Sequence, residues 1–139
     1  MIFSVEQVDW SESRSQLMTV RTAVFVIEQQ IPAELEEDEW DIASQHVLIT
    51  TEGRPLATGR LLPDGHIGRV AVLQECRGQG LGILVMNKLM EIAQVDGHRQ
   101  LALSAQVQVS EFYSKLGFVE KGGVYQEAGI GHILMSKNI

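Results

Sequence analysis

Three glycines at alternate positions stand in the stretch Glu75–Gly82 (ECRGQGLG), directly before a long segment of apolar residues at helical spacing. That spacing predicts a helix that begins at about Gly80 and ends before Gly97. A helix start presents unpaired backbone N–H groups and a partial positive charge, so it attracts an anion. Glycines let a phosphate approach this backbone closely, although three glycines alone can also serve only to shape a turn from a strand into a helix.

Two common phosphate-binding loops are excluded by the spacing of these glycines. The sequence lacks G-x-x-x-x-G-K-[ST], and G-x-G-x-G lacks the third glycine of the dinucleotide-binding fingerprint. No acidic residue ends the next expected strand, where the ribose of a dinucleotide would find its partner. We therefore expect neither a P-loop kinase nor a nicotinamide-dependent dehydrogenase.

Alternating apolar residues and turn residues predict the elements that position this loop. Helices are expected over 14–30, with Ser11 or Ser13 as the N-cap, over 81–96 and over 109–117. Strands are expected at 2–8, 46–53, 54–65, 66–73 and 100–107, followed by a hairpin over 118–137. This order predicts a mixed α/β (α+β) fold, with a mostly antiparallel sheet of six to seven strands and helices on its faces.

One crossover connection decides where the glycine loop lies. The strand that ends near Leu73, the helix from Gly80 and the strand from Gln100 form a β-α-β unit. Its two strands should therefore be parallel, with the loop at their carboxyl ends. Open α/β sheets hold their ligands at that edge.

Length, charge and cysteine content limit the classes of protein to consider. The 139 residues suit one domain over 1–139, and 18 acidic against 11 basic residues give a net charge of −7, which argues against nucleic-acid binding. Cys76 is the only cysteine, so neither an intrachain disulfide nor a structural zinc site is expected. The sequence shows no signal peptide and no apolar run long enough for a membrane span, so we expect a cytoplasmic protein.

The hexad Arg77–Gly82 fits the pattern [QR]-x-x-G-x-[GA] between a strand and a helix, and FYSKLGF follows at 112–118. With these motifs in this order, nearly the whole chain resembles the GNAT superfamily of N-acetyltransferases. The resemblance implies a GNAT-type fold with a central β-α-β unit that binds acetyl-CoA, and no metal. It also implies transfer of the acetyl group to a primary amine, by direct attack in a ternary complex.

The same resemblance implies a set of coenzyme-binding residues. The N–H groups from Gly78 to Ile83 would hold the coenzyme A pyrophosphate, and the backbone edge of Val70–Val72 would pair with the pantetheine arm. Arg77 either contacts phosphate or is a solvated loop residue, and Gln106 stands where relatives often carry a coenzyme-binding asparagine. The implied residues are Val70, Ala71, Val72, Arg77, Gly78, Gln79, Gly80, Leu81, Gly82, Ile83 and Gln106.

Tyr113 falls where the family places the tyrosine that protonates the departing thiolate. The competing interpretation puts its ring on a core-facing stripe with Val109, Phe112 and Leu116. In the family, a backbone N–H near the end of the coenzyme-binding strand, here about Val72, donates to the thioester oxygen.

A general base is missing from the place where many relatives have one, because the strand Leu101–Ser104 carries no carboxylate. Candidates elsewhere are Glu28, the acidic segment Glu34–Asp41, His66, and His132 acting through water, and an acceptor of low basicity would need no strong base. The acidic segment, with six acids and no base, either attracts a cationic amine or is a solvated run of charge.

Two other functions stay open. One is an acyltransferase like the acyl-homoserine-lactone synthases, whose order of residues is comparable to Arg21, Phe25, Asp38, Asp41 and Arg60. Those enzymes usually have a longer chain and a poorer glycine hexad. The other is a non-catalytic, coenzyme A-binding regulatory module, because the usual carboxylate is missing. If the chain is an N-acetyltransferase, its acceptor is a small-molecule or peptide amine. The sequence also leaves a homodimer open.

Overall fold

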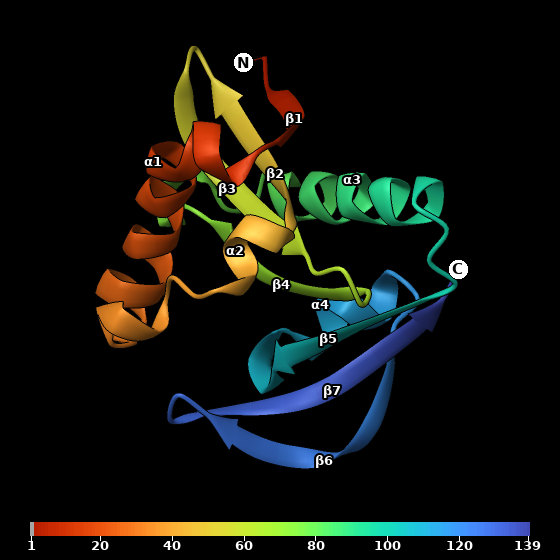
Figure 1. The fold of residues 1–139 in the computed structure, drawn as a ribbon. Coiled ribbons are helices and arrows are strands. Elements are labelled where there is room, and N and C mark those ends of the chain that lie inside the picture. The colour runs from red at the N-terminus through yellow and green to blue at the C-terminus, as the bar shows by residue number, and fades with distance from the viewer. Residues whose placement is uncertain (1) are drawn as a thin grey trace.

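The computed structural model describes residues 2–139 and contains a seven-stranded sheet in the order β1-β2-β3-β4-β5-β7-β6 (Figure 1). Its strands are β1 (Ser4–Val8), β2 (Gln45–Thr51), β3 (Arg54–Leu61), β4 (His66–Val72), β5 (Gln100–Gln106), β6 (Val119–Glu127) and β7 (Ile130–Asn138). Neighbouring strands are antiparallel except β4 and β5, which are parallel. The predicted mixed, mostly antiparallel sheet is confirmed.

The helical segments follow the predicted order with two differences in the first one. They are α1 (Trp10–Arg21), η1 (Thr22–Glu28), η2 (Ala33–Leu35), α2 (Trp40–Ala43), η3 (Gln74–Cys76), α3 (Leu81–Val95), η4 (Val107–Val109) and α4 (Ser110–Lys115). The expected N-cap at Ser11 or Ser13 is wrong, because α1 starts after extended Asp9 and so buries the Trp10 side chain. The second half of the helix expected over 14–30 is the wider π-helix η1, in which the Gln29 N–H donates to the Val24 carbonyl at 3.1 Å.

Two successive residues of β3 show that the helices cover both faces of the sheet. Gly59 lies against α3, since a Cβ built there would be 2.7 Å from Val85 and 2.9 Å from Leu89. Arg60 points to the other face and bonds to Asp41 of α2. Because successive strand residues alternate between faces, α3 and the pair α1/α2 lie on opposite sides (Figure 1).

The helix α3 is the main apolar element of its face. Leu81, Val85, Met86, Leu89 and Ile92 are buried, and they pack in one core with Leu101 and Leu103 of β5 among others. No helix in the part of the chain that the structure describes combines the length and the apolar character that a membrane crossing requires.

The parallel strands β4 and β5 pair only at His66↔Ala102 and Ile67↔Leu103 and then diverge (Figure 1). A β-bulge in β4 accompanies this divergence. Between the pairs Arg60↔Gly68 and Thr58↔Ala71, two β4 residues oppose Gly59 alone, and one of them, Arg69, has a left-handed φ of 52°. Bulges bend a strand and increase its twist, which accounts for the opening between β4 and β5.

The close contact at Gly59 gives a stability test. Gly59→Ala should lower the free energy of unfolding by about 1–3 kcal/mol, because the new methyl group would overlap Val85 and Leu89. Gly68→Ala is the matched control, since that strand glycine has no atom within 4 Å of a built Cβ, and it should cost less than about 0.5 kcal/mol. Urea unfolding measures both values. Equal stability of the two variants would contradict the close approach of α3 to β3.

Candidate functional site

The glycine loop between β4 and α3 has three glycines with two different roles. Gly78 and Gly80 have left-handed φ values of 83° and 80°, and no atom lies within 4 Å of a built Cβ at either position. Gly82 instead lies against the Phe112 ring, 3.3 Å from a built Cβ. The first two glycines therefore shape the loop and leave open space beside it, and the third lets α4 approach α3.

The N-terminus of α3 presents a row of free backbone N–H groups. The first helical bond runs from the Leu84 N–H to the Gly80 carbonyl at 3.2 Å. The N–H groups from Gly78 to Ile83 contact no protein acceptor in residues 2–139. Together with the helix dipole and the open space at Gly78 and Gly80, they fit a phosphate group.

Beside this loop, β4 presents a free backbone edge. The Leu73 N–H donates to the Leu56 carbonyl of β3 at 2.9 Å, so the backbone groups of Val72 point the opposite way, into the gap toward β5. The Val72 carbonyl accepts a hydrogen bond from Arg77 Nε at 3.1 Å. This edge is the one that the sequence assigns to the pantetheine arm at Val70, Ala71 and Val72.

Arg77 lies exposed in this loop, but its side chain has a partner. Its two terminal nitrogens contact the Glu28 carboxylate at 2.7 and 2.6 Å. Hydrogen bonds from Arg77 lower the pKa of Glu28, and the same bonds raise the pKa of Arg77. The contact of Arg77 with phosphate remains a prediction.

Gln106 ends β5 and faces the side of the sheet covered by η1. Its side-chain amide donates to the Gln29 side chain at 2.8 Å and its oxygen accepts from Gln108 at 2.7 Å. The alternating burial of β5, with Leu103 and Ala105 inside, agrees with this orientation. Its expected contact with the coenzyme remains a prediction.

Tyr113 lies on α4, half-buried, beside the N-terminus of α3. Its ring packs edge-on against Phe112 at 5.0 Å and Phe118 at 6.2 Å between ring centroids. Burial raises the pKa of Tyr113 to about 12, and its hydroxyl has no partner among the described residues. The expected core-facing stripe forms with Phe112 and Leu116 but not with Val109, which is exposed. A packed ring with a free hydroxyl is compatible with the predicted acid.

Two of the candidate bases are placed poorly for chemistry at this loop. His66 begins β4 at the end where β4 and β5 are still paired, and it contacts Asp64 at 3.0 Å. His132 is almost fully buried on β7, with Nδ1 2.7 Å from the Ile130 carbonyl oxygen.

Ser104 belongs to the strand on which many relatives carry a catalytic glutamate and which here has no carboxylate. Its hydroxyl forms a hydrogen bond with the hydroxyl of Tyr125 on β6. Tyr125 was not singled out from the sequence, because nothing local indicates that β6 and β7 bring it beside β5. The two hydroxyl groups supply no base of their own near pH 7.

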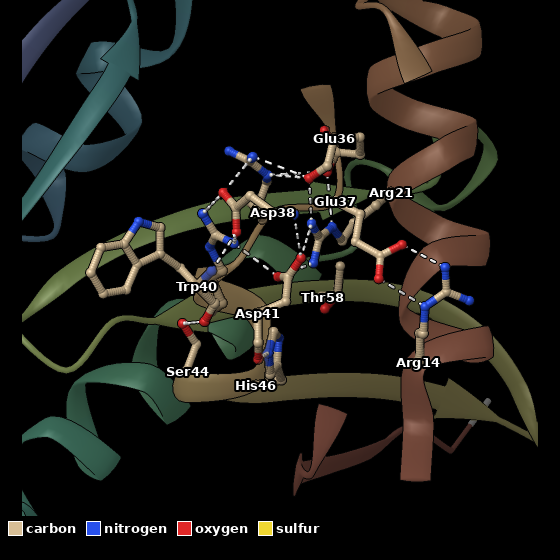
Figure 2. Close-up of polar contacts among 12 residues, drawn as sticks. Arg14, Arg21, Glu36, Glu37, Asp38, Trp40, Asp41, Ser44, His46 and Thr58 are labelled. Atoms are coloured by element: carbon tan, nitrogen blue, oxygen red, sulfur yellow. Dashed lines mark hydrogen bonds and ion pairs between the residues drawn. The ribbon is translucent and has the colours of Figure 1, made fainter. Parts of the chain in front are cut away.

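The acidic segment folds into a buried group of ion pairs, which we call the acid–arginine cluster (Figure 2). It consists of Arg21, Glu36, Asp38, Asp41, Arg60 and Arg69. Fully buried Arg21 contacts Asp41 and Glu36 at 2.8 Å each. Arg60 contacts Asp41 at 2.8 Å and Asp38 at 2.7 Å, and the bulge residue Arg69 reaches Asp38 at 3.2 Å.

Burial and ion pairing act against each other on the carboxylates of this cluster. Burial raises the pKa of Asp41, but hydrogen bonds from Arg21 and Arg60 outweigh it and hold that pKa below its usual value. Burial also raises the pKa of Glu36, and there its arginine neighbours only partly offset the effect. Three arginines therefore face three carboxylates in a shared, largely dry environment.

The alternative of a solvated acidic run is wrong for three of the six acids. Glu36, Asp38 and Asp41 belong to the acid–arginine cluster, and Glu37 pairs with Arg14. Within the described residues, only Glu34 and Glu39 of this segment have no ion-pair partner. The segment thus has little free charge left with which to attract a cationic amine.

This chain belongs to the GNAT acetyltransferase family. The sequence model of the acetyltransferase (GNAT) domain matches residues 6–139. YjcF of Bacillus subtilis (strain 168), named an uncharacterized N-acetyltransferase, is 37% identical over 123 residues, which are 86% of this chain and 88% of YjcF. The crystal structure of an acyl-CoA N-acyltransferase from Pseudomonas aeruginosa matches with a TM-score of 0.84 and 32% identity, over 98% of both chains. Proteins of this family use acyl-CoA.

A further likeness concerns the fold alone. The CoA-dependent acyl-homoserine lactone synthase BjaI matches with a TM-score of 0.83 over 99% of this chain and 84% of its own, at 15% identity. As for metals, no group of three or more His, Cys, Asp or Glu in residues 2–139 is placed to hold an ion.

Removing one charge from the acid–arginine cluster should lower the stability of the fold by a large amount. Asp41→Asn should destabilise the fold by about 3–5 kcal/mol, because it leaves Arg21 and Arg60 buried with one carboxylate too few. Glu37→Gln breaks an exposed pair in the same segment and should cost less than about 1 kcal/mol. Denaturant unfolding followed by circular dichroism compares them. A cost of under 1 kcal/mol for Asp41→Asn would show that the cluster is not a buried unit.

Proposed function

We propose that this chain transfers an acetyl group from acetyl-CoA to a primary amine, which attacks the thioester directly in a ternary complex, and that residues 1–139 act as one N-acetyltransferase domain. The single observation that carries the proposal is the row of free N–H groups from Gly78 to Ile83, beside a backbone edge that β5 leaves unpaired. A diphosphate suits the first feature and an extended pantetheine arm suits the second. The acceptor is a small-molecule or peptide amine.

The reaction must remove a proton from the acceptor's ammonium group and stabilise negative charge on the thioester oxygen. An alkylammonium group with a pKa near 10.4 costs about 4.6 kcal/mol to deprotonate at pH 7. The thioester oxygen gains negative charge during attack, and the Val72 N–H, which points into the gap, is available to donate to it.

Tyr113 is proposed to act on the departing sulfur. With a pKa of about 12, its phenol is neutral at pH 7 and can donate a hydrogen bond. A free thiol has a pKa near 8.5, so complete proton transfer from Tyr113 to the thiolate would be unfavourable by itself. The phenol therefore stabilises the sulfur and passes on the second proton that the attacking nitrogen loses.

The two alternatives fit the structure less well. For an acyl-homoserine-lactone synthase-like enzyme, the comparable order of Arg21, Asp41 and Arg60 gives no separate support, because here these residues bind one another in a buried cluster. A non-catalytic coenzyme A sensor would not need the free hydroxyl of Tyr113 in the active-site region. Free thiol release from acetyl-CoA across a panel of amines decides between enzyme and sensor. Tight binding without any release would favour the sensor.

Coenzyme binding depends on the space at Gly80. Gly80→Glu should weaken the affinity for acetyl-CoA by about 100-fold, because a carboxylate would enter the proposed phosphate site. Gly97→Glu is the matched control: this glycine follows α3, has a left-handed φ of 87° and also has no neighbour within 4 Å. Isothermal titration calorimetry measures both affinities. Wild-type affinity in Gly80→Glu would remove the loop as the phosphate site.

The role of Tyr113 predicts a loss of rate without a loss of affinity. Tyr113→Phe should lower kcat by about 10- to 100-fold and leave the Kd for acetyl-CoA within twofold, because only the free hydroxyl is removed. Steady-state kinetics and calorimetry give the two values. An unchanged kcat would eliminate Tyr113 as the acid. A large loss of stability would indicate that its role is packing.

A further inference from the structure

Glu28, the last residue of η1, and Gln29, which follows it, reach opposite sides of the gap between β4 and β5. Glu28 binds Arg77, whose Nε in turn donates to the Val72 carbonyl at the end of β4. Gln29 accepts a hydrogen bond from Gln106 at the end of β5. The end of η1 therefore bridges the two strands where they have separated.

Arg77 lies at two places where the proposed coenzyme would bind, namely the free edge of β4 and the start of the glycine loop. Its Nε donates to the Val72 carbonyl, which belongs to the free edge of β4, and Arg77 directly precedes Gly78, where the free N–H groups begin. Both partners of the Glu28–Arg77 pair are partly exposed, with side-chain exposures of 31% and 42%. Such a pair is weak, so a diphosphate with several anionic oxygens can compete for the guanidinium.

Four of the six carboxylates of the acidic segment are already engaged. Glu36, Asp38 and Asp41 are in the acid–arginine cluster, Glu37 binds Arg14, and β5 carries no carboxylate at Leu101–Ser104. Glu28 is the carboxylate that reaches the open end of β4, through Arg77. The charge of Glu75 also acts on Arg77.

We propose, building on the acetyltransferase function above, that Glu28 accepts the proton of the acceptor's ammonium group, and that coenzyme binding frees it by drawing Arg77 to the diphosphate. Arg77 thus keeps the base neutralised until the acyl donor is bound. A carboxylate released in this way supplies the base that is missing from β5.

The protons and electrons of the step balance. The ammonium group gives one proton to the Glu28 carboxylate, and the free amine attacks the thioester carbon. The new C–N bond forms, the C–S bond breaks, and its electron pair stays on the sulfur. The nitrogen loses a second proton, which reaches the sulfur by way of the Tyr113 hydroxyl and yields the thiol. Glu28 then releases its proton to water.

The first test measures binding of coenzyme A by calorimetry and needs no acceptor. Glu28→Gln removes the competing charge while keeping the side-chain shape, so coenzyme A should bind about two- to five-fold more tightly than to the wild type. Glu37→Gln breaks an exposed Arg–Glu pair elsewhere and should leave the Kd unchanged. An unchanged or weaker affinity in Glu28→Gln would overturn the exchange of partners at Arg77.

The second test follows the Glu28 carboxyl group by ¹³C NMR, with its signal assigned by its loss in Glu28→Gln. Hydrogen bonds from Arg77 lower the pKa of Glu28 in the free chain. With saturating coenzyme A, that pKa should rise to its ordinary value or above it. If the pKa stays low in the complex, Glu28 is not released and the proposal fails.

The third test uses the amine of the panel that gives the fastest thiol release from acetyl-CoA. At pH 7 and saturating substrates, kcat of Glu28→Gln should fall about 100-fold, and it should recover as the pH approaches 10, where the amine loses its proton without help. Wild-type kcat at pH 7 would overturn the role of Glu28. If instead the wild-type chain neither binds coenzyme A nor releases thiol, the proposed function itself fails.

Discussion

The site depends on how early the pairing between β4 and β5 ends. Two parallel pairs hold the strands at His66 and Ile67, and the β-bulge at Arg69 then turns β4 away. A sheet interior normally satisfies its own backbone groups, so an opening inside the sheet leaves N–H and C=O groups that a ligand, a side chain or water must satisfy. Arg77 satisfies one of them, at Val72, and the glycine loop lies next to the same opening. The fold thus leaves a free backbone edge at its centre, away from the outer edges of the sheet.

The acid–arginine cluster secures one wall of this opening. A buried group of ion pairs contributes little net stability compared with apolar side chains of the same volume, since desolvation offsets the attraction. It does, however, require a definite geometry, because each guanidinium must meet its carboxylates at bonding distance. Residues 36–41 are therefore fixed against β3 and β4 although they include only one short helix, α2. Arg69 belongs both to the bulge and to the cluster, so the shape of β4 and the position of this segment are coupled.

The sequence was sufficient to predict the order of the main elements, the crossover and the place of the glycine loop before α3, because these depend on local patterns: alternation, helical spacing and glycines. It was insufficient where pairing joins distant segments. Arg21 and Asp41 are 20 residues apart and Arg77 and Glu28 are 49 apart, and no local rule links them. The start of α1 was misplaced because Asp9, Ser11 and Ser13 are all good N-caps, and the burial of Trp10 decides among them. The π-helical widening of η1 leaves no signature in residue types.

The acid–arginine cluster also determines where the net charge of −7 lies. Its three arginines and three carboxylates cancel, so of the eleven basic and eighteen acidic residues, eight and fifteen remain to carry the whole excess on the rest of the molecule. Acyl-CoA is itself a polyanion, and an acidic protein repels it at long range. Attraction begins only at short range, within reach of the N–H dipoles at the start of α3. Added salt should thus favour the encounter, opposite to a protein that collects phosphates on a basic surface.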